Sequence, residues 1–180
     1  MSASDTPPPQ VTHSPLVECA LQTERHVAAA GWDQPVRLFS LVETASLIAA
    51  EPSLADHLLD PAPGALSAIE QEDLPPTDPL DEFLGWLSWP EAVDGVAIAL
   101  ERIVLPPQAE QDLPDDPDEA ALALADHPDR ADVRLFVAVA RDGASTCLLR
   151  QRAHDADDRV AIGRDIAPDL VAALAATLLD

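Results

Sequence analysis

The sequence has no lysine and no tyrosine, and all ten of its basic residues are arginine. Aspartate and glutamate number 33, so the 180-residue chain carries a formal net charge of −23. An excess of negative charge this large repels phosphate backbones and anionic lipid headgroups. We therefore expect neither nucleic acid nor a membrane surface among the partners of this protein.

Cysteine is also scarce. Cys19 and Cys147 form no CxxC pair and lack the spacing of zinc ligands, so we interpret both as small buried residues in a reducing cytosol. The N-terminal segment has no basic region followed by an apolar core, and no apolar run reaches the roughly 18 residues of a membrane span. These absences predict a cytoplasmic protein.

Motifs of catalysis and of cofactor binding are missing as well. With only six glycines, the sequence contains no Gly-rich phosphate loop, and it has no G-x-S-x-G motif. Its carboxylates are too numerous for any acid–base pair to stand out. We therefore predict no cofactor and identify no catalytic residue.

Hydrophobic residues make up 47% of the chain, which is enough to build a core. Residues 1–14 are rich in proline, with Pro7-Pro8-Pro9 at their centre, and are predicted to be a disordered tail. Residues 15–180 have the length of a single domain.

Helix and strand signals follow one another irregularly along this domain. Ser14 is a good N-cap for a first helix, with Pro15 at the first helical position and Gly31 after the end. Asp78 and Pro79 predict a second helix start of the same kind. Strands are predicted over 36–42, 95–105, 132–140 and 145–152, further helices over 44–50, 54–59, 119–125 and 168–179, and polar connectors over 60–79 and 110–118.

This order of elements predicts the fold class. The strands do not alternate one-for-one with crossover helices, and Asp142-Gly143 predicts a tight hairpin. We therefore predict an α+β fold, in which a mainly antiparallel sheet of about four strands packs with N- and C-terminal helices. Secretion-chaperone-like folds have layouts of this general type, an analogy that carries no function.

The arginines are unevenly distributed. Seven of the ten fall within residues 130–164, which hold only five acidic residues and so have a net charge of 7 − 5 = +2. The rest of the chain, with 3 arginines and 28 acidic residues, has a net charge of 3 − 28 = −25. A two-residue turn at Asp142-Gly143 places Arg134 on the face of the hairpin opposite Arg150 and Arg152. The expected pairs are Ala140–Ser145, Val137–Leu148, Leu135–Arg150 and Val133–Arg152.

Two interpretations of this hairpin stay open. In the simpler one, the arginines pair with the protein's own acidic connectors and reduce its self-repulsion. In the other, Arg134, Arg150 and Arg152 form a groove for an anion or an acidic peptide, because guanidinium groups on rigid strands can hold a carboxylate or phosphate through two hydrogen bonds.

The segment His154-Asp155-Ala156-Asp157-Asp158 has ligand types suited to a divalent metal. His154, Asp155 and Asp157 are therefore candidate metal ligands. The spacing does not match a calcium loop, because Val160 replaces the required glycine and Ile166 the final glutamate. The alternative interpretation is a solvated acidic loop.

Three tryptophans stand out in a chain with 3% aromatic residues. They are expected to be core anchors. The alternative is a partner-binding surface formed by Trp32 and Trp89, which lie near predicted helix ends, because tryptophan is enriched at binding hot spots.

Short motifs spread along most of the chain form one set, namely Gly31-Trp32-Asp33-Gln34-Pro35, Arg37-Leu38-Phe39, Glu70-Gln71-Glu72, Leu74-Pro75, Trp89-Pro90, Glu101-Arg102-Ile103-Val104-Leu105-Pro106-Pro107, His127-Pro128, Asp132-Val133-Arg134, Arg141-Asp142-Gly143, Cys147 and His154-Asp155. From about Leu16 onward, the set resembles an uncharacterised actinobacterial family of acidic cytoplasmic proteins with a propionibacterial type member. The resemblance implies a single domain and brings no activity, cofactor or site residue with it.

The sequence thus predicts a non-enzymatic protein-interaction or adaptor domain, chiefly because no catalytic constellation is found. The first alternative is a metal-assisted hydrolase or other enzyme that uses His154 with Asp155, Asp157 or Asp158. The second is a small-ligand binder that uses the arginines of the hairpin.

Overall fold

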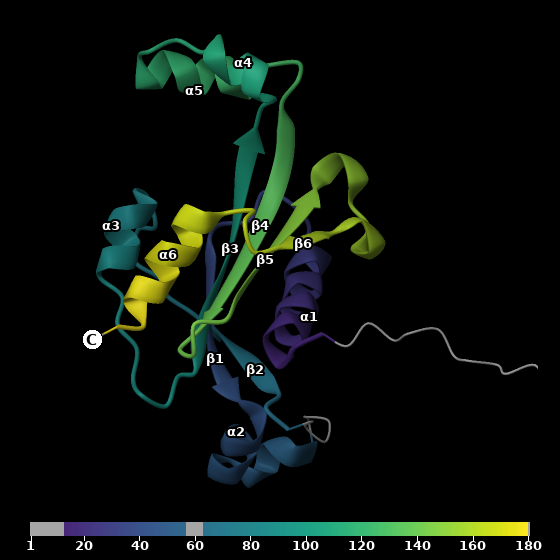
Figure 1. Cartoon of the computed structure of the whole chain (residues 1–180), viewed down its shortest axis with the longest axis vertical. Coiled ribbons are helices and arrows are strands. Elements are labelled where there is room, and N and C mark those ends of the chain that lie inside the picture. Colours follow the sequence, from purple (N-terminus) through teal and green to yellow (C-terminus); the bar gives the residue numbers. More distant parts are fainter. Residues whose placement is uncertain (1–12, 57–62, 180) are drawn as a thin grey trace, which may run out of the picture.

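A computed structural model describes residues 13–56 and 63–179 of the chain. They form the predicted α+β fold around an antiparallel sheet, but the sheet has six strands rather than about four. Most of the predicted tail lies outside the described residues. In the order in which they neighbour one another, the strands are β2 (Leu66–Gln71), β1 (Arg37–Glu43), β3 (Gly95–Val104), β4 (Ala131–Ala140), β5 (Ser145–Gln151) and β6 (Ala161–Gly163) (Figure 1).

The four predicted strands are β1, β3, β4 and β5, and they form the middle of the sheet. β1, β3 and β4 are runs of bulky apolar residues that can be recognised by their own pattern, whereas β5 is predicted as the partner strand that follows the Asp142-Gly143 turn. The two strands that sequence analysis missed, β2 and β6, are the edges. β2 lies in the segment predicted as a polar connector, and β6 has only three residues. Each is held by one neighbour, β1 or β5, so its own sequence carries a weak signal.

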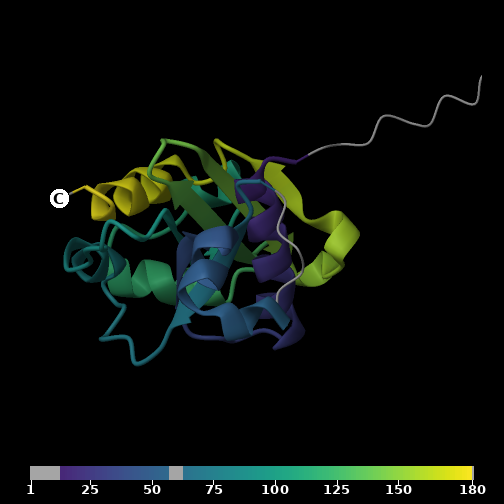
Figure 2. The ribbon, with the colours of Figure 1, turned by 90° about the horizontal axis from the view of Figure 1, so that it is seen from below.

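Helices cover both faces of the sheet (Figures 1 and 2). On one face, α1 (Pro15–Ala29) packs on a cluster that includes Phe136, and its N-cap Ser14 accepts a hydrogen bond from the Val17 N–H at 3.3 Å, as predicted. On the other face, α3 (Leu80–Gly85) and α6 (Pro168–Thr177) pack on a cluster that includes Val137. Successive residues of β4 thus belong to two separate cores.

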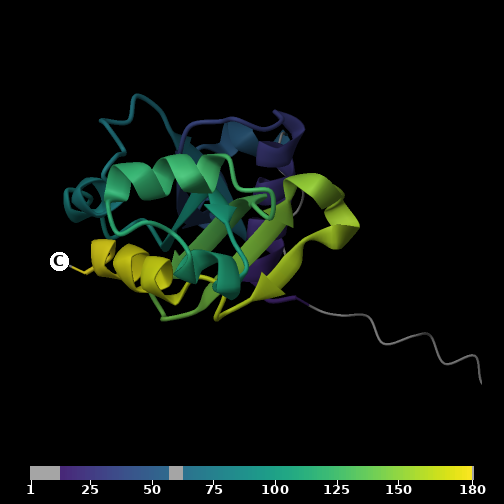
Figure 3. The same cartoon turned by 90° about the horizontal axis from the view of Figure 1, so that it is seen from above.

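The strands β3 and β4 form a long antiparallel pair that extends beyond the rest of the sheet. Two helices, α4 (Pro107–Gln111) and α5 (Pro117–Ala125), lie across its end (Figures 1 and 3). At the other end of the molecule lie α2 (Thr44–Ala50) and a 3-10 helix, Pro52–Asp56. None of the helices in residues 13–56 and 63–179 is long and apolar enough to cross a membrane.

Two local predictions were wrong. The N-cap of α3 is Pro79 rather than Asp78, and no side chain among the described residues caps this helix. The β4–β5 turn contains three residues, Arg141 to Gly143, rather than two. The Gly143 N–H donates to the Ala140 carbonyl at 3.0 Å, and Gly143 has φ +93°, a conformation that glycine adopts without strain.

The additional turn residue changes which faces the arginines share. The observed pairs are Val139–Ser145, Val137–Cys147, Leu135–Leu149 and Arg134–Arg150. A shift of one residue moves every side chain of a strand to the opposite face. Arg134 and Arg150 therefore lie on the same face, where sequence analysis had placed them on opposite faces.

Candidate functional site

Three charged side chains form a row across the middle of the sheet. Glu101 on β3 pairs with Arg134 on β4, and Arg134 pairs with Arg150 on β5. All three residues lie on the face that α1 covers. Two residues further along these strands, on the same face, Phe136 of β4 and Leu148 of β5 belong to the apolar cluster under α1. Two guanidinium groups are thus brought to the boundary of a hydrophobic core.

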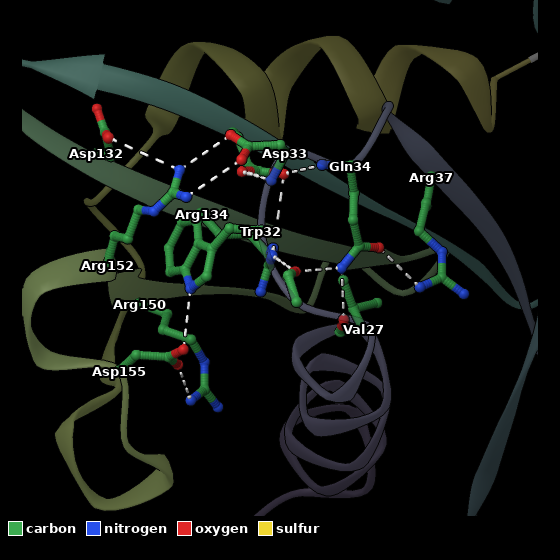
Figure 4. A network of polar contacts seen from close by, with 12 residues as sticks. Val27, Trp32, Asp33, Gln34, Arg37, Asp132, Arg134, Arg150, Arg152 and Asp155 are labelled. Carbon is green, nitrogen blue, oxygen red and sulfur yellow. Dashed lines mark hydrogen bonds and ion pairs between the residues drawn. The ribbon is translucent and has the colours of Figure 1, made fainter.

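Arg150 is held by carboxylates from two separate segments, and Figure 4 shows its contact with one of them, Asp155. Glu24 of α1 accepts from its Nε and Nη2 at 2.5 and 2.8 Å, and both side chains are only 3% exposed. Asp155 accepts from Nη1 at 2.9 Å and Asp157 from Nη2 at 2.7 Å. These charge-assisted hydrogen bonds, that to Glu24 foremost, raise the pKa of Arg150.

Arg134 is buried with fewer partners. Its Nη2 donates to the Gly31 carbonyl and lies 3.9 Å from Glu101, and its guanidinium carbon is 4.4 Å from the centre of the Trp32 ring. Among the described residues, its Nη1 has no hydrogen-bond partner. Burial lowers the pKa of Arg134, with the nearby Glu101 opposing that effect.

The loop that carries Trp32 is fixed at several points. The Trp32 Nε1 donates to Asp155 Oδ2 at 2.9 Å, and this bond is the main cause of the lowered pKa of Asp155. Glu101 accepts from the backbone N–H groups of Asp33 and Gln34 at 2.8 and 2.6 Å. Asp33 in turn binds both Nη atoms of Arg152 (Figure 4).

The arginines of the hairpin therefore converge, and the protein's own acids surround them. We name this group the arginine cluster. Arg150 uses four of its five N–H groups on carboxylates, so little donor capacity is left for a ligand. Six carboxylates face the three guanidinium groups, so the cluster is net negative and disfavours an anion. Its members are Arg134, Arg150, Arg152, Glu24, Glu101, Asp33, Asp132, Asp155 and Asp157.

The candidate metal ligands lie beside this cluster. His154 ends a 3-10 helix, Arg152–His154, and Asp157 and Asp158 lie in another, Asp157–Arg159. Asp155 and Asp157 direct carboxylate oxygens to Arg150. Within the part of the chain that the structure describes, no three His, Cys, Asp or Glu side chains are grouped to hold a metal ion.

Both cysteines are buried and free. Burial raises the pKa of the Cys19 and Cys147 thiols, which keeps them protonated and unreactive. Their positions agree with the interpretation of both as small core residues.

The exposed tryptophan is Trp86, whereas the two that were considered for a partner-binding surface, Trp32 and Trp89, are half-buried. Trp32 is half-buried in the arginine cluster, and Trp89 is half-buried with its Nε1 donating to Thr177 Oγ1 at 3.1 Å. Trp86, by contrast, is 81% exposed. The helical stripe of Leu80, Phe83, Leu84 and Leu87 already points away from position 86, so a helical wheel of this segment could have identified it.

Trp86 lies at one wall of a surface groove of about 500 Å³. It is the C-cap of α3, where its N–H donates to the Phe83 carbonyl at 3.2 Å. Phe83, only 2% exposed, anchors this part of the groove in the core. We name this feature the Trp86 groove; it is lined by Pro75, Pro76, Asp78, Pro79, Glu82, Phe83 and Trp86.

The acids of the Trp86 groove differ from those of the arginine cluster. Neither Asp78 nor Glu82 takes part in an ion pair within the described residues, and both are exposed. The helix α3 and the segment after β5 lie on opposite sides of the molecule in all three views (Figures 1, 2 and 3). One side of the protein therefore has neutralised arginines, and the other has an apolar groove with unneutralised acids.

A family model described as PPA1309-like protein matches residues 16–179. No curated protein and no solved structure matches the chain.

Proposed function

The chain belongs to the PPA1309-like protein family, and we propose that it is a non-enzymatic protein-interaction domain whose partner docks at the Trp86 groove. The observation that carries the proposal is the 81% exposure of Trp86 beside a groove of proline rings. When a partner covers a tryptophan side chain, a large apolar surface is removed from water, and for this reason tryptophan is a frequent binding hot spot.

The rest of the chain supports a binding role over a catalytic one. The pKa of Arg150 is raised because its guanidinium is engaged in ion pairs inside the fold, so this shift marks a structural contact rather than a catalytic group. The alternative enzyme needs His154 with the neighbouring aspartates, and two of these, Asp155 and Asp157, are committed to Arg150. The alternative anion binder needs free guanidinium donors, and those of Arg150 are already bound by carboxylates of the protein itself. The buried thiols are consistent with work in a reducing cytoplasm.

The test is co-purification followed by reconstitution with the full chain. Proteins recovered with the tagged wild type are compared with those recovered with Trp86→Ala and with Leu122→Ala. Leu122 is a matched control, because it is an apolar side chain 69% exposed on α5, away from the groove. A recovered protein is then purified alone, and its Kd is measured against all three chains.

We expect equal Kd values for wild type and Leu122→Ala. For Trp86→Ala we expect a Kd at least about 30-fold larger, which is the loss of affinity typical of a hot-spot residue. The proposal is overturned if no protein is recovered reproducibly, or if Trp86→Ala binds every recovered protein as tightly as wild type does.

A further inference from the structure

We infer that the Trp86 groove binds an extended, proline-containing segment that carries arginine or lysine. This inference rests on the proposed function and adds the chemical class of the partner. It is carried by the juxtaposition of three features in one groove: an exposed indole ring, proline walls without N–H donors, and two exposed acids outside any described ion pair.

The first step concerns backbone hydrogen bonding. Pro75, Pro76 and Pro79 line the groove, and proline has no N–H to donate. A partner strand that docked here would leave much of its own backbone unpaired, at a cost in free energy. A polyproline II segment needs no such ladder, because its backbone stays solvated and has no internal hydrogen bonds.

The second step concerns shape. Polyproline II segments are recognised by grooves that aromatic side chains line, because flat rings pack against pyrrolidine rings. The Trp86 groove has a volume of about 500 Å³ and offers the exposed indole of Trp86, which the buried Phe83 supports from the core. The segment is also already extended before it binds, so it loses little conformational entropy on docking.

The third step concerns charge. Asp78 and Glu82 line the groove and take part in no ion pair within residues 13–56 and 63–179. The whole chain adds a negative field of formal charge −23. A basic side chain of the partner would gain from both acids and from the face of Trp86.

The chain's own Pro7-Pro8-Pro9 run is a poor occupant on the same grounds. The residues before Ser14 include Asp5 and contain no arginine. A second copy of this chain would therefore bring further negative charge to an acidic groove, which disfavours self-association there.

The test uses three synthetic peptides of equal length, with binding to the full chain measured by fluorescence anisotropy. The first alternates arginine with pairs of prolines, the second replaces each arginine by glutamate, and the third replaces each proline by alanine. We expect the first peptide to bind at least about tenfold more tightly than the other two, a difference of about 1.4 kcal/mol.

Variants locate the site and its charge. Trp86→Ala should lose binding of the first peptide, and Leu122→Ala should keep it. The double variant Asp78→Asn/Glu82→Gln should bind at least about tenfold more weakly, with a smaller dependence on salt. Its matched control, Glu110→Gln/Glu119→Gln, removes the same charge from exposed positions of α4 and α5 and should bind as wild type does.

Several outcomes overturn the inference: the first peptide does not bind, it binds Trp86→Ala equally well, or the glutamate or alanine peptide binds as tightly. Self-association of the wild type that Trp86→Ala abolishes also overturns it, since the occupant is then a second copy. If the peptides fail while a recovered protein still needs Trp86, only this inference falls. If binding of every recovered protein is independent of Trp86, the proposed function falls too.

Discussion

Arg134 and Arg150 stand directly opposite each other on β4 and β5, on the face of the sheet that α1 covers. Two like charges in this position repel each other, and burial removes the water that would screen them. Glu24 from α1 and two aspartates after β5 offset that repulsion. The cluster thereby fixes a helix and a loop to the sheet.

The pair Arg150–Glu24 should be the most sensitive point of the cluster. Arg150→Met leaves the Glu24 carboxylate buried without its partner, so we expect a loss of about 3–5 kcal/mol in the free energy of unfolding, measured by urea denaturation. Arg152→Ala serves as the control, because Arg152 and its partner Asp33 are solvent-exposed, and it should change stability little. Equal effects of the two substitutions would contradict this assignment.

Arg134 should behave differently from Arg150, although the two face each other. Arg134 is buried with one N–H group that has no partner among the described residues, and its carboxylate contact is long, at 3.9 Å. Arg134→Met removes that unpaired group and keeps an apolar contact with Trp32, so we expect a loss of no more than about 2 kcal/mol. The same urea titration checks it, and a loss as large as that of Arg150→Met would refute this ordering.

The lowered pKa of Asp155 predicts a pH dependence. Its pKa in the fold lies below the ordinary value of 3.8, chiefly because of the hydrogen bond from Trp32 and then that from Arg150. The ionised carboxylate therefore stabilises the fold above about pH 4, and this contribution is lost as pH falls through the folded pKa. Asp155→Asn should lower stability at pH 7, and its difference from wild type should shrink below about pH 4.

The measurement is denaturation of both proteins at several pH values. Asp158→Asn is the control, since Asp158 accepts no hydrogen bond from any of the described residues. A difference between Asp155→Asn and wild type that stays constant with pH would show that this carboxylate does not stabilise the fold through its charge.

Two glycines should respond oppositely to alanine. A Cβ at Gly95 would lie 2.6 Å from the Val139 carbonyl oxygen and 3.2 Å from the Ala140 Cα, both of them backbone atoms of β4. We expect Gly95→Ala to cost about 1–3 kcal/mol. A Cβ at Gly85 would meet no atom of residues 13–56 and 63–179 within 4 Å, so Gly85→Ala at the end of α3 should gain about 0.4–1 kcal/mol in the free energy of unfolding. Thermal unfolding of the two variants distinguishes the signs.

The tryptophans give a test of stability that is separate from binding. Trp89 is half-buried, packs against the core and donates a hydrogen bond to Thr177, so Trp89→Ala should lower the free energy of unfolding by about 3 kcal/mol. Trp86→Ala should change it by less than about 0.5 kcal/mol, because the side chain is exposed. A large loss for Trp86→Ala would mean that this residue holds the fold rather than a partner.

The first helix and the strands β1, β3 and β4 could be predicted because each carries its own pattern, and β5 because it follows the Asp142-Gly143 turn. β3 begins at Gly95 and β5 at Ser145, as expected, and α1 begins at Pro15 behind its N-cap Ser14. The strands β2 and β6 could not, since pairing with a neighbour stabilises them more than their own residues do.

The candidate site depended on finer details. A single additional residue in the turn before Ser145 decided that Arg134 and Arg150 share a face, and turn length is poorly specified by an Asp-Gly pair alone. The buried carboxylate that pairs with Arg150 is Glu24, and no local sequence pattern connects these two residues. The exposure of Trp86 follows from its position off the apolar stripe of α3, whereas nearness to a helix end does not distinguish an exposed tryptophan from the half-buried Trp32 and Trp89.

The Glu24–Arg150 contact joins residues 126 positions apart. During synthesis, α1 leaves the ribosome long before β5 exists, so the Glu24 carboxylate stays in water while most of the sheet is being made. The helix can settle on the sheet at low cost only when Arg150 arrives to take up its charge. Completion of the chain and closure of this core are thus coupled, and a chain that stops before Ser145 would have its first helix but no partner for the buried charge.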